Sequence, residues 1–249
     1  MSAFAEGRLG FAVGDIHGRA DLLARMFEVL EREGERANPS QAPIAVFLGD
    51  YVDRGPDSAE VIELLLTQRP EGFERRYLKG NHEAAMLAFL DDPLGHRAWL
   101  GHGGLATLAS YNVHPLPSMG ASNEQLMAAA VAFKSKLPAS HLAFLQGLER
   151  YVVLGEYAFV HAGVDAKRAL EQQTDADLFW SRDRFLNDAK LFSHRVVHGH
   201  TPTKAPYQDP RRIGLDTGAY FSNILSAAQF ENQDVRFLAV SLSDPFSHF

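Results

Sequence analysis

The sequence predicts an α/β fold of layered sheets flanked by helices, with a helical insertion. Three observations predict it. Residues 9–13 and 44–48 are short apolar runs typical of buried strands, and residues 74–78 form a third short strand. A helical pattern follows each of these strands. Beyond Arg150 the pattern turns to strands.

The N-terminal part is predicted as strand, loop and helix three times over. In order, the predicted elements are a loose tail (1–7), strand 9–13, helix 21–34, strand 44–48, helix 57–68, strand 74–78 and a helix that runs to about Leu90. The first helix carries an apolar stripe that includes Leu22, Met26 and Leu30. Each of the three loops between strand and helix carries residue types that bind metals.

Residues 93–150 are interpreted as a helical insertion within a single domain of residues 1–249, because no linker-like composition separates them. The predicted elements that follow the GHGG sequence at 101–104 are helices over about 122–136 and 139–148, then strands 151–154, 157–160, 195–198, 213–216, 223–230 and 235–242. GHGG could cradle an anion, but a glycine-rich turn is the interpretation preferred here.

Composition excludes several classes of function. The 249 residues contain no cysteine, which rules out disulfides, thiolate metal sites and cysteine-nucleophile phosphatases. The net charge is -7 and no basic run stands out, so no nucleic-acid partner is expected. No signal peptide and no apolar run of ~20 residues is seen, so we expect no membrane partner and a cytoplasmic location.

The stretch GDYVDRG, Gly49 to Gly55, crowds two carboxylates and a guanidinium at the end of a buried strand. Sites in α/β proteins are built at such strand ends. Asp50 and Asp53 could bind a metal or hold a base, and Arg54 could hold an anion. The alternative is a polar turn in which Asp53 and Arg54 are simply paired.

Six polar residues at predicted strand ends form a candidate ligand set: Asp15, His17, Asp50, Asn81, His161 and His200. Two carboxylates, an amide and three imidazoles suit a pair of first-row divalent ions. Asp15 and His17, two residues apart, would point to one face of an extended segment. Each residue has an ordinary explanation, such as Asn81 as a helix N-cap, but these explanations must hold at all six positions at once. His198 could face the same side as His200.

Further residues suit acid catalysis and anion binding. His82 follows Asn81 directly and could donate a proton to a leaving group, with Asp53 fixing its tautomer. Arg54 can bind phosphate as a planar fork. A second arginine is expected at Arg182, with Arg184 as its rival.

The motifs GDIHG, GDYVDRG, GNHE, HAG and GHT, in this order over residues 14–201, resemble the PPP family of metal-dependent phosphoesterases. That family includes serine/threonine protein phosphatases, the phage lambda phosphatase and symmetric diadenosine tetraphosphate hydrolases. The resemblance implies a calcineurin-like β-sandwich flanked by helices. It implies one divalent ion on Asp15, His17 and Asp50, a second on Asp50, Asn81, His161 and His200, an Asp53–His82 acid pair, and attack by a metal-bridging hydroxide.

The expected activity is hydrolysis of phosphomonoesters, most of all phosphoserine and phosphothreonine in proteins, since GNHE resembles the protein phosphatases and dinucleotide hydrolases usually read GNHD. A symmetric bis(5'-nucleosyl)-tetraphosphatase is the alternative, and an inactive binding scaffold a further one. The cofactors expected are two divalent ions, Mn²⁺ first, with Fe or Zn²⁺ as alternatives. The expected partner is a phosphoprotein or a small phosphoester. Tyr220 and Phe221, which follow DTGA (216–219), line the pocket or only the sheet edge.

Overall fold

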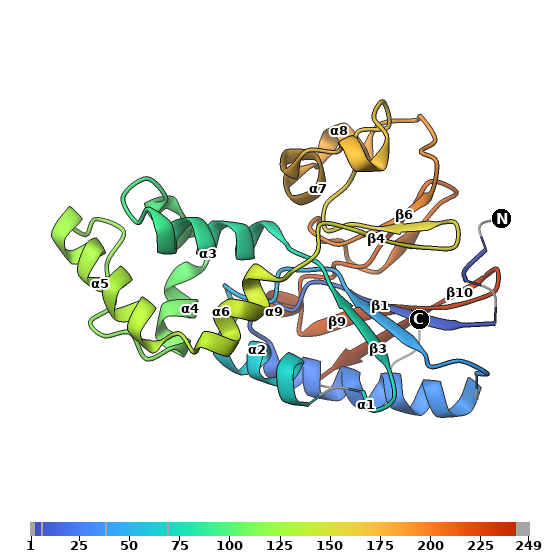
Figure 1. Cartoon of the computed structure of the whole chain (residues 1–249), viewed down its shortest axis with the longest axis horizontal. Coiled ribbons are helices and arrows are strands. Elements are labelled where there is room, and N and C mark those ends of the chain that lie inside the picture. Colours follow the sequence, from blue (N-terminus) through green and yellow to red (C-terminus); the bar gives the residue numbers. More distant parts are fainter. Residues whose placement is uncertain (1–2, 6, 38, 69, 243–249) are drawn as a thin grey trace.

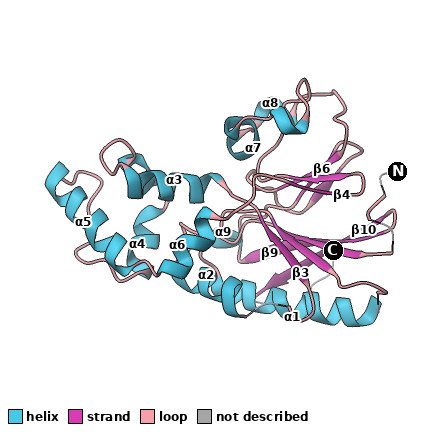
Figure 2. Cartoon of the chain, in the orientation of Figure 1, coloured by secondary structure: helices cyan, strands magenta, loops and turns pink. Residues whose placement is uncertain are grey.

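Two five-stranded mixed sheets lie face to face at the centre of the fold (Figure 1). The structure, a computed structural model, describes residues 3–5, 7–37, 39–68 and 70–242. Helices cover the outer faces of both sheets, and a group of helices extends to one side (Figure 2). The predicted α/β architecture is confirmed.

The first sheet has the strand order β10-β9-β1-β2-β3. Its strands are β1 (Leu9–Val13), β2 (Ile44–Phe47), β3 (Glu74–Tyr77), β9 (Ile224–Glu231) and β10 (Asp234–Ser241). β1, β2 and β3 are parallel, and β9 and β10 join them antiparallel. Every residue of β1 and β2 is buried, because both faces of the sheet are covered.

The second sheet repeats this arrangement with the order β4-β5-β6-β8-β7. Its strands are β4 (Val152–Leu154), β5 (Tyr157–Phe159), β6 (Arg195–His198), β7 (Tyr207–Gln208) and β8 (Arg212–Gly214). β5, β6 and β8 are parallel, and the edge strands β4 and β7 are antiparallel to their neighbours. Each sheet thus has three parallel strands whose carboxyl ends share one edge.

A cluster of apolar side chains from both sheets fills the space between them. Val46 and Phe230 come from the first sheet, and Phe159 and Val197 from the second. Phe4 also belongs to this cluster, with its ring stacked on Phe230 at a centroid distance of 5.6 Å. The expectation of a loose tail over residues 1–7 is therefore wrong for residues 3–5, because Phe4 gains burial there. Residues 1, 2 and 6 lie outside the described residues.

Three helices follow the parallel strands of the first sheet: α1 (Ala20–Ala37), α2 (Ser58–Thr67) and α3 (Asn81–Asp91). The helices between α3 and β4 are η1 (Arg97–His102), α4 (Gly104–Ser110), α5 (Asn123–Lys136) and α6 (Ala139–Gln146), all within the predicted insertion. They form the group that extends away from the sheets (Figure 1). α5 starts as predicted because Ser122 and Gln125 form a reciprocal N-terminal cap.

Short helices cover the second sheet and one edge of the site. They are η2 (Leu170–Gln172), α7 (Asp175–Trp180), α8 (Asp183–Leu186) and α9 (Ala219–Ser222). The sequence pattern did not predict them, nor η1, α4 and the two-residue strand β7, because such short elements show no hydrophobic period. None of the helices within the described ranges has the length and apolar character needed to cross a bilayer.

Candidate metal centre

All six parallel strands end at the same place, and each is followed by a polar residue of the site. Asp15 follows β1, Asp50 follows β2, Asn81 follows β3, His161 follows β5, His200 follows β6 and Asp216 follows β8. All six side chains are buried. The carboxyl ends of the strands in α/β sheets are where ligands bind, and here two sheets contribute three residues each.

Asp216 is the residue that sequence reasoning missed. Its strand was predicted to run to residue 216, but β8 ends at Gly214, which leaves Asp216 in the turn beside the other ligands. Burial and the neighbouring Asp50 carboxylate raise the pKa of Asp216 to about 6, although the hydrogen bond from the Gly218 N–H opposes this shift. The DTGA sequence after a strand was the available signal.

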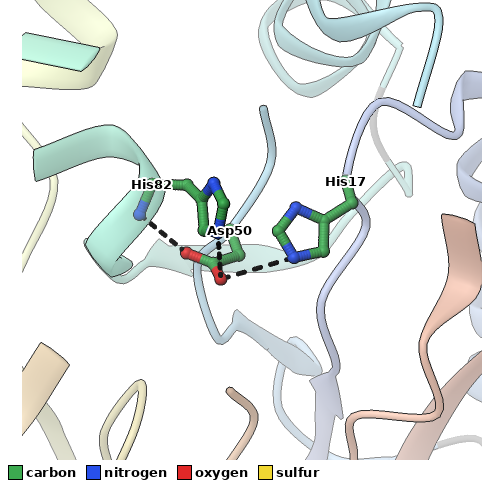
Figure 3. Close-up of side chains that lie close together, drawn as sticks. All are labelled: His17, Asp50 and His82. Atoms are coloured by element: carbon green, nitrogen blue, oxygen red, sulfur yellow. Dashed lines mark hydrogen bonds and ion pairs between the residues drawn. The ribbon is translucent and has the colours of Figure 1, made fainter. Parts of the chain in front are cut away.

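Asp50 lies at the centre of two groups of metal-binding residue types. One group is His17, Asp50 and His82, and the other is Asp50, His161 and His200. Figure 3 shows His17 and His82 converging on the Asp50 carboxylate, with His17 Nε2 at 3.5 Å and His82 Nε2 at 3.9 Å from Oδ2. His161 Nε2 lies 3.3 Å from the other oxygen, Oδ1. This placement lets one carboxylate serve both groups.

Two of the histidines are fixed in the tautomer that a metal ligand needs. His17 donates its Nδ1–H to the Val52 carbonyl at 2.9 Å, and His161 donates its Nδ1–H to the Leu48 carbonyl at 2.8 Å. The other ring nitrogen, Nε2, therefore faces the centre of the site. A ring nitrogen held by a backbone carbonyl is the usual support for a metal-binding histidine.

The buried carboxyl groups and histidines of the site favour a bound cation. Asp15 Oδ1 is buried and has no hydrogen-bond partner among the described residues. Burial and the nearby Asp216 carboxylate hold the pKa of Asp15 well above its usual value. Burial alone would lower the pKa of His161, but the Asp50 carboxylate outweighs it and raises that pKa to about 10. Divalent ions with nitrogen and oxygen ligands fit this donor set.

Asp15 and Asn81 are placed by contacts with the second group. Asp15 Oδ2 accepts a hydrogen bond of 2.9 Å from the His200 backbone N–H, and Asn81 Oδ1 lies 3.0 Å from His161 Nε2. Gly199 makes this approach of Asp15 feasible, since a Cβ at residue 199 would collide with Asp15 Oδ1. The reason given for the pairing of Asp15 with His17 is wrong, because His17 has a left-handed φ of 46° and the segment is not extended.

The site is also where the backbone is strained. Five of the eight non-glycine residues with positive φ in the described chain are His17, Asp50, Asp53, Arg54 and His200. Each such conformation costs on the order of 1–3 kcal/mol and persists only where surrounding contacts enforce it. These turns change the direction of the chain after β1, β2 and β6, where site residues follow the strands.

Glu83 supplies much of that enforcement. It is fully buried, and its two carboxylate oxygens accept hydrogen bonds from the backbone N–H groups of Asp50, Tyr51, Val52 and Gly80. Burial raises the pKa of Glu83 to about 7. The last residue of GNHE therefore anchors the GDYVDRG loop and does not face the cleft.

Asp53 and His82 form the predicted pair. His82 donates Nδ1–H to Asp53 Oδ2 at 2.7 Å, and Asp53 also accepts from Trp99 Nε1 at 2.8 Å and Thr107 Oγ1 at 2.6 Å. Burial alone would lower the pKa of His82, but the carboxylates of Asp50 and Asp53 outweigh it and raise that pKa. The His82 ring is thus locked with Nε2 toward the cleft.

Arg54 and Arg182 lie at the ligand cluster, whereas Arg184 does not. Arg54 lies 3.0 Å from both His17 Nε2 and His82 Nε2, and Arg182 Nε donates to His200 Nε2 at 3.0 Å. Arg184 points elsewhere and pairs with Asp165 and Asp177. Arg182, rather than Arg184, therefore lies at the ligand cluster, while its role in phosphate binding stays a prediction.

A cleft of about 660 Å³ opens over these residues. Its walls include Arg54, His82, Trp180, Arg182, His200 and Tyr220. Residues 101–103 of GHGG also line it, and Gly103 approaches Arg54 so closely that a Cβ would lie 2.6 Å from the Arg54 nitrogen. A larger groove of about 810 Å³ elsewhere, lined by residues such as His194 and Gln208, contains none of the candidate ligands.

His198 does not face the ligands as its spacing from His200 suggested. Its ring packs on Phe185 at 5.2 Å, and its Nε2 accepts a hydrogen bond of 3.0 Å from Arg212. Burial lowers the pKa of His198 to about 4. The left-handed conformation of His200, with φ of 63°, breaks the strand alternation between the two residues.

Named proteins similar to this chain agree with the geometry. Two are bis(5'-nucleosyl)-tetraphosphatases PrpE named asymmetrical: that of Bacillus thuringiensis is 27% identical over 253 residues, covering 94% of each chain, and that of Bacillus subtilis 26% identical over 252 residues, covering 94% of this chain and 95% of the other. The fold resembles a solved putative diadenosine tetraphosphatase, with a TM-score of 0.59, 18% identity and coverage of 96% and 98%. It also resembles a protein serine/threonine phosphatase from Saccharomyces cerevisiae, with a TM-score of 0.51, 17% identity and coverage of 94% and 79%.

The family expected from the motifs is confirmed over most of the chain. Residues 11–230 match the calcineurin-like phosphoesterases, a span that contains every candidate ligand. The two mixed sheets, the residues at the strand ends and the fit to divalent ions all agree with that match. The chain belongs to the calcineurin-like phosphoesterase family.

Proposed function

We propose that this chain hydrolyses bis(5'-nucleosyl) tetraphosphates with the help of two divalent ions, Mn²⁺ first, and cleaves them asymmetrically. The observation that carries the proposal is the pair of arginines in one cleft. Arg54 adjoins His17 and His82 of the first ligand group, and Arg182 adjoins His200 of the second. Two planar guanidinium groups on either side of a metal site suit a chain of phosphates.

The names of the relatives support the same substrate. The PrpE proteins named as asymmetrical bis(5'-nucleosyl)-tetraphosphatases align with 94% of this chain. The sequence-based alternative was a symmetric enzyme, and those names favour the asymmetric products. Hydrolysis then consumes one water, breaks one P–O–P bond and releases a nucleoside monophosphate and a nucleoside triphosphate.

The site residues have separate tasks in this proposal. Asp15, His17 and Asp50 would hold one ion, and Asp50, Asn81, His161 and His200 the other. When bound, such ions neutralise phosphate charge and make water a better nucleophile. Arg54 and Arg182 bind non-bridging phosphate oxygens and fix the chain. His82, held by Asp53, presents Nε2 to the leaving oxygen and can deliver a proton there.

The phosphoserine and phosphothreonine reading has weaker support. It rested on the glutamate of GNHE, but Glu83 is fully buried and its oxygens are used by four backbone N–H groups. A residue that does not reach the cleft cannot select the substrate by contact. The inactive-scaffold reading has no missing ligand to support it, since all six candidates are present and buried.

A product analysis tests the proposal. The purified protein is incubated with Mn²⁺ and diadenosine tetraphosphate, and separately with phosphoserine and phosphothreonine peptides. We expect AMP and ATP in equal amounts and turnover well above that on the peptides. Two ADP per substrate would show symmetric cleavage, and faster release of phosphate from the peptides would overturn the proposal. Asp50→Asn is the inactive control, and Arg184→Ala, outside the cleft, is the active one.

A further inference from the structure

Trp180 is an aromatic residue that lines the cleft without a partner. It is the last residue of α7, it is 49% exposed, and it makes no hydrogen bond or ring contact with any residue that the structure describes. A single exposed tryptophan on a protein surface is unremarkable in itself. This one stands two residues before Arg182, beside the ligand cluster.

The position of Trp180 is fixed by the residues that precede it. Leu178 and Phe179 are buried in the core under the second sheet, so Trp180 is the side chain that remains outside. The Leu178 carbonyl accepts a hydrogen bond of 2.7 Å from the Ala162 N–H, one residue after His161. The start of the helix is capped by Thr174. The backbone that carries Trp180 is therefore fixed next to His161, a metal-ligand candidate.

The ring of Tyr220, which also lines the cleft, already packs against other side chains of the protein. The Arg54 guanidinium lies over its ring, 4.9 Å from the centroid, and the His17 and Phe221 rings pack against it at 5.4 Å and 4.9 Å. Arg19 anchors the helix that carries Tyr220 through the Ala219 carbonyl, at 2.8 Å. Tyr220 thus positions Arg54, whereas Trp180 has a ring face free for a ligand.

We propose that Trp180 is the stacking platform for one nucleobase of the substrate, on the Arg182 side of the site. The inference rests on the proposed function for the phosphate chain but not for the base. A base has a flat π face, and stacking on an aromatic side chain tolerates any base. Arg182 then binds the phosphates attached to that nucleoside. The base at one end of the substrate then stacks on Trp180, whereas the base at the other end, near Tyr220, has no such platform. This asymmetry agrees with release of a monophosphate and a triphosphate.

Two ligands that differ only in the nucleoside test this assignment. α,β-Methylene-ADP and methylenediphosphonate carry the same non-hydrolysable phosphate pair, and their affinities are measured as competitive inhibition of the Mn²⁺-loaded enzyme. We expect Trp180→Ala to weaken α,β-methylene-ADP by about 5- to 100-fold, the scale of one stacked base. Methylenediphosphonate should bind as in the wild type, and Trp180→Phe should keep most of the affinity.

Fluorescence gives a second readout that does not depend on turnover. The chain has two tryptophans, and Trp99 is buried, with its ring packed on Phe89 and Phe133. The nucleotide should therefore quench the wild-type emission and leave that of Trp180→Phe unchanged. Tyr207→Ala, an exposed aromatic residue outside the cleft, is the matched control and should behave as the wild type.

The outcomes separate this inference from the proposed function. If dinucleotides are not hydrolysed but Trp180→Ala still discriminates between the two ligands, the base platform stands and the tetraphosphatase does not. Equal weakening of both ligands would show that Trp180 acts only through Arg182, and would overturn the platform. An unchanged affinity for both, with slower turnover of a phosphopeptide, would assign Trp180 to a peptide side chain and overturn it as well.

Discussion

One histidine–carboxylate pair of the site, His82 with Asp53, can be compared with a similar pair outside it, His141 with Glu63. His82 donates to Asp53 at 2.7 Å, and His141 lies 3.1 Å from Glu63. Both rings are buried. Asp53 is fully buried and accepts from two further side chains, whereas the Glu63 side chain is half exposed.

The second ring nitrogen decides what each pair can do. Nε2 of His82 faces the cleft beside Arg54 and Asp50, whereas Nδ1 of His141 is used by the Tyr111 hydroxyl at 2.8 Å. His141 therefore ties α2 and Tyr111, the residue after α4, to α6, and both of its ring nitrogens are used in these contacts. Similar residue types thus border the cleft in one place and only pack in the other, because His82 presents Nε2 to the cleft beside Arg54 whereas both ring nitrogens of His141 are bonded within the fold.

Metal removal should give the largest difference between the two pairs, with hydrolysis lost at one and the packing retained at the other. Chelation should abolish hydrolysis and Mn²⁺ should restore it, because the proposed reaction beside the Asp53–His82 pair depends on the ions. The Tyr111–His141–Glu63 contacts need no metal, so the chelated protein should keep its helical circular dichroism. Full activity in a preparation verified as metal-free would refute the metal-dependent site.

Substitution of each histidine sharpens the same comparison. His82→Asn should keep the metals and lower kcat by ~10²-fold or more, the usual scale for an acid–base group. The loss should be smaller for an activated aryl phosphate, whose leaving group needs no proton. His141→Asn should instead leave kcat near the wild type and lower the free energy of unfolding by about 1–3 kcal/mol, as for a buried hydrogen-bonded group. Kinetics and thermal melts measure both, and a large kcat loss in His141→Asn would break the distinction.

Substitution of Arg182 and of Arg184 should give a smaller difference in kinetics. Arg182→Ala should raise KM or lower kcat clearly, because its Nε contacts His200 at the cleft. Arg184→Ala should stay near the wild type, because Arg184 pairs with Asp165 and Asp177 outside the cleft. The reverse ranking would mean that the anion clamp lies on the other side of Asp183.

Arg54→Lys tests whether geometry or charge matters at the other arginine. The guanidinium contacts both His17 and His82, which one ammonium group cannot reproduce in the same planar arrangement. We expect kcat/KM to fall although the charge is kept. Wild-type kinetics in Arg54→Lys would show that only the positive charge of Arg54 matters, and not the geometry of its guanidinium.

Glu33 extends the comparison to a buried carboxylate whose partners do not titrate near neutral pH. Burial opposes its ionisation, but the hydrogen bond from Arg236 and the charges of Arg236, Arg36 and Arg32 outweigh it and hold the pKa of Glu33 below its usual value. A carboxyl with a lowered pKa stabilises the fold above its unfolded pKa, and this is lost as pH falls through the folded pKa. Glu33→Gln should thus flatten the acid side of the stability curve, measured by urea unfolding between neutral pH and pH about 3. An unchanged slope would contradict this assignment.

The sequence by itself determined the strands other than β7, the longer helices and the identity of five strand-end residues. It could do so because each motif is local: an apolar run, a glycine and a polar residue follow one another within a few positions. The order of the motifs also pointed to the family that the comparison confirmed. Composition excluded thiolate chemistry, since no cysteine is present.

Only the tertiary structure decided which side chains meet. Asp216 joins the site because β8 stops two residues earlier than its hydrophobic pattern suggested. His198 does not face the site because the left-handed backbone of His200 breaks the strand alternation. Glu83 points into the fold because its carboxylate accepts hydrogen bonds from four backbone N–H groups. Trp180 reaches the cleft on a helix too short to show a period. These outcomes depend on backbone direction at strand ends and on contacts between distant segments, and a linear pattern of hydrophobic residues encodes neither.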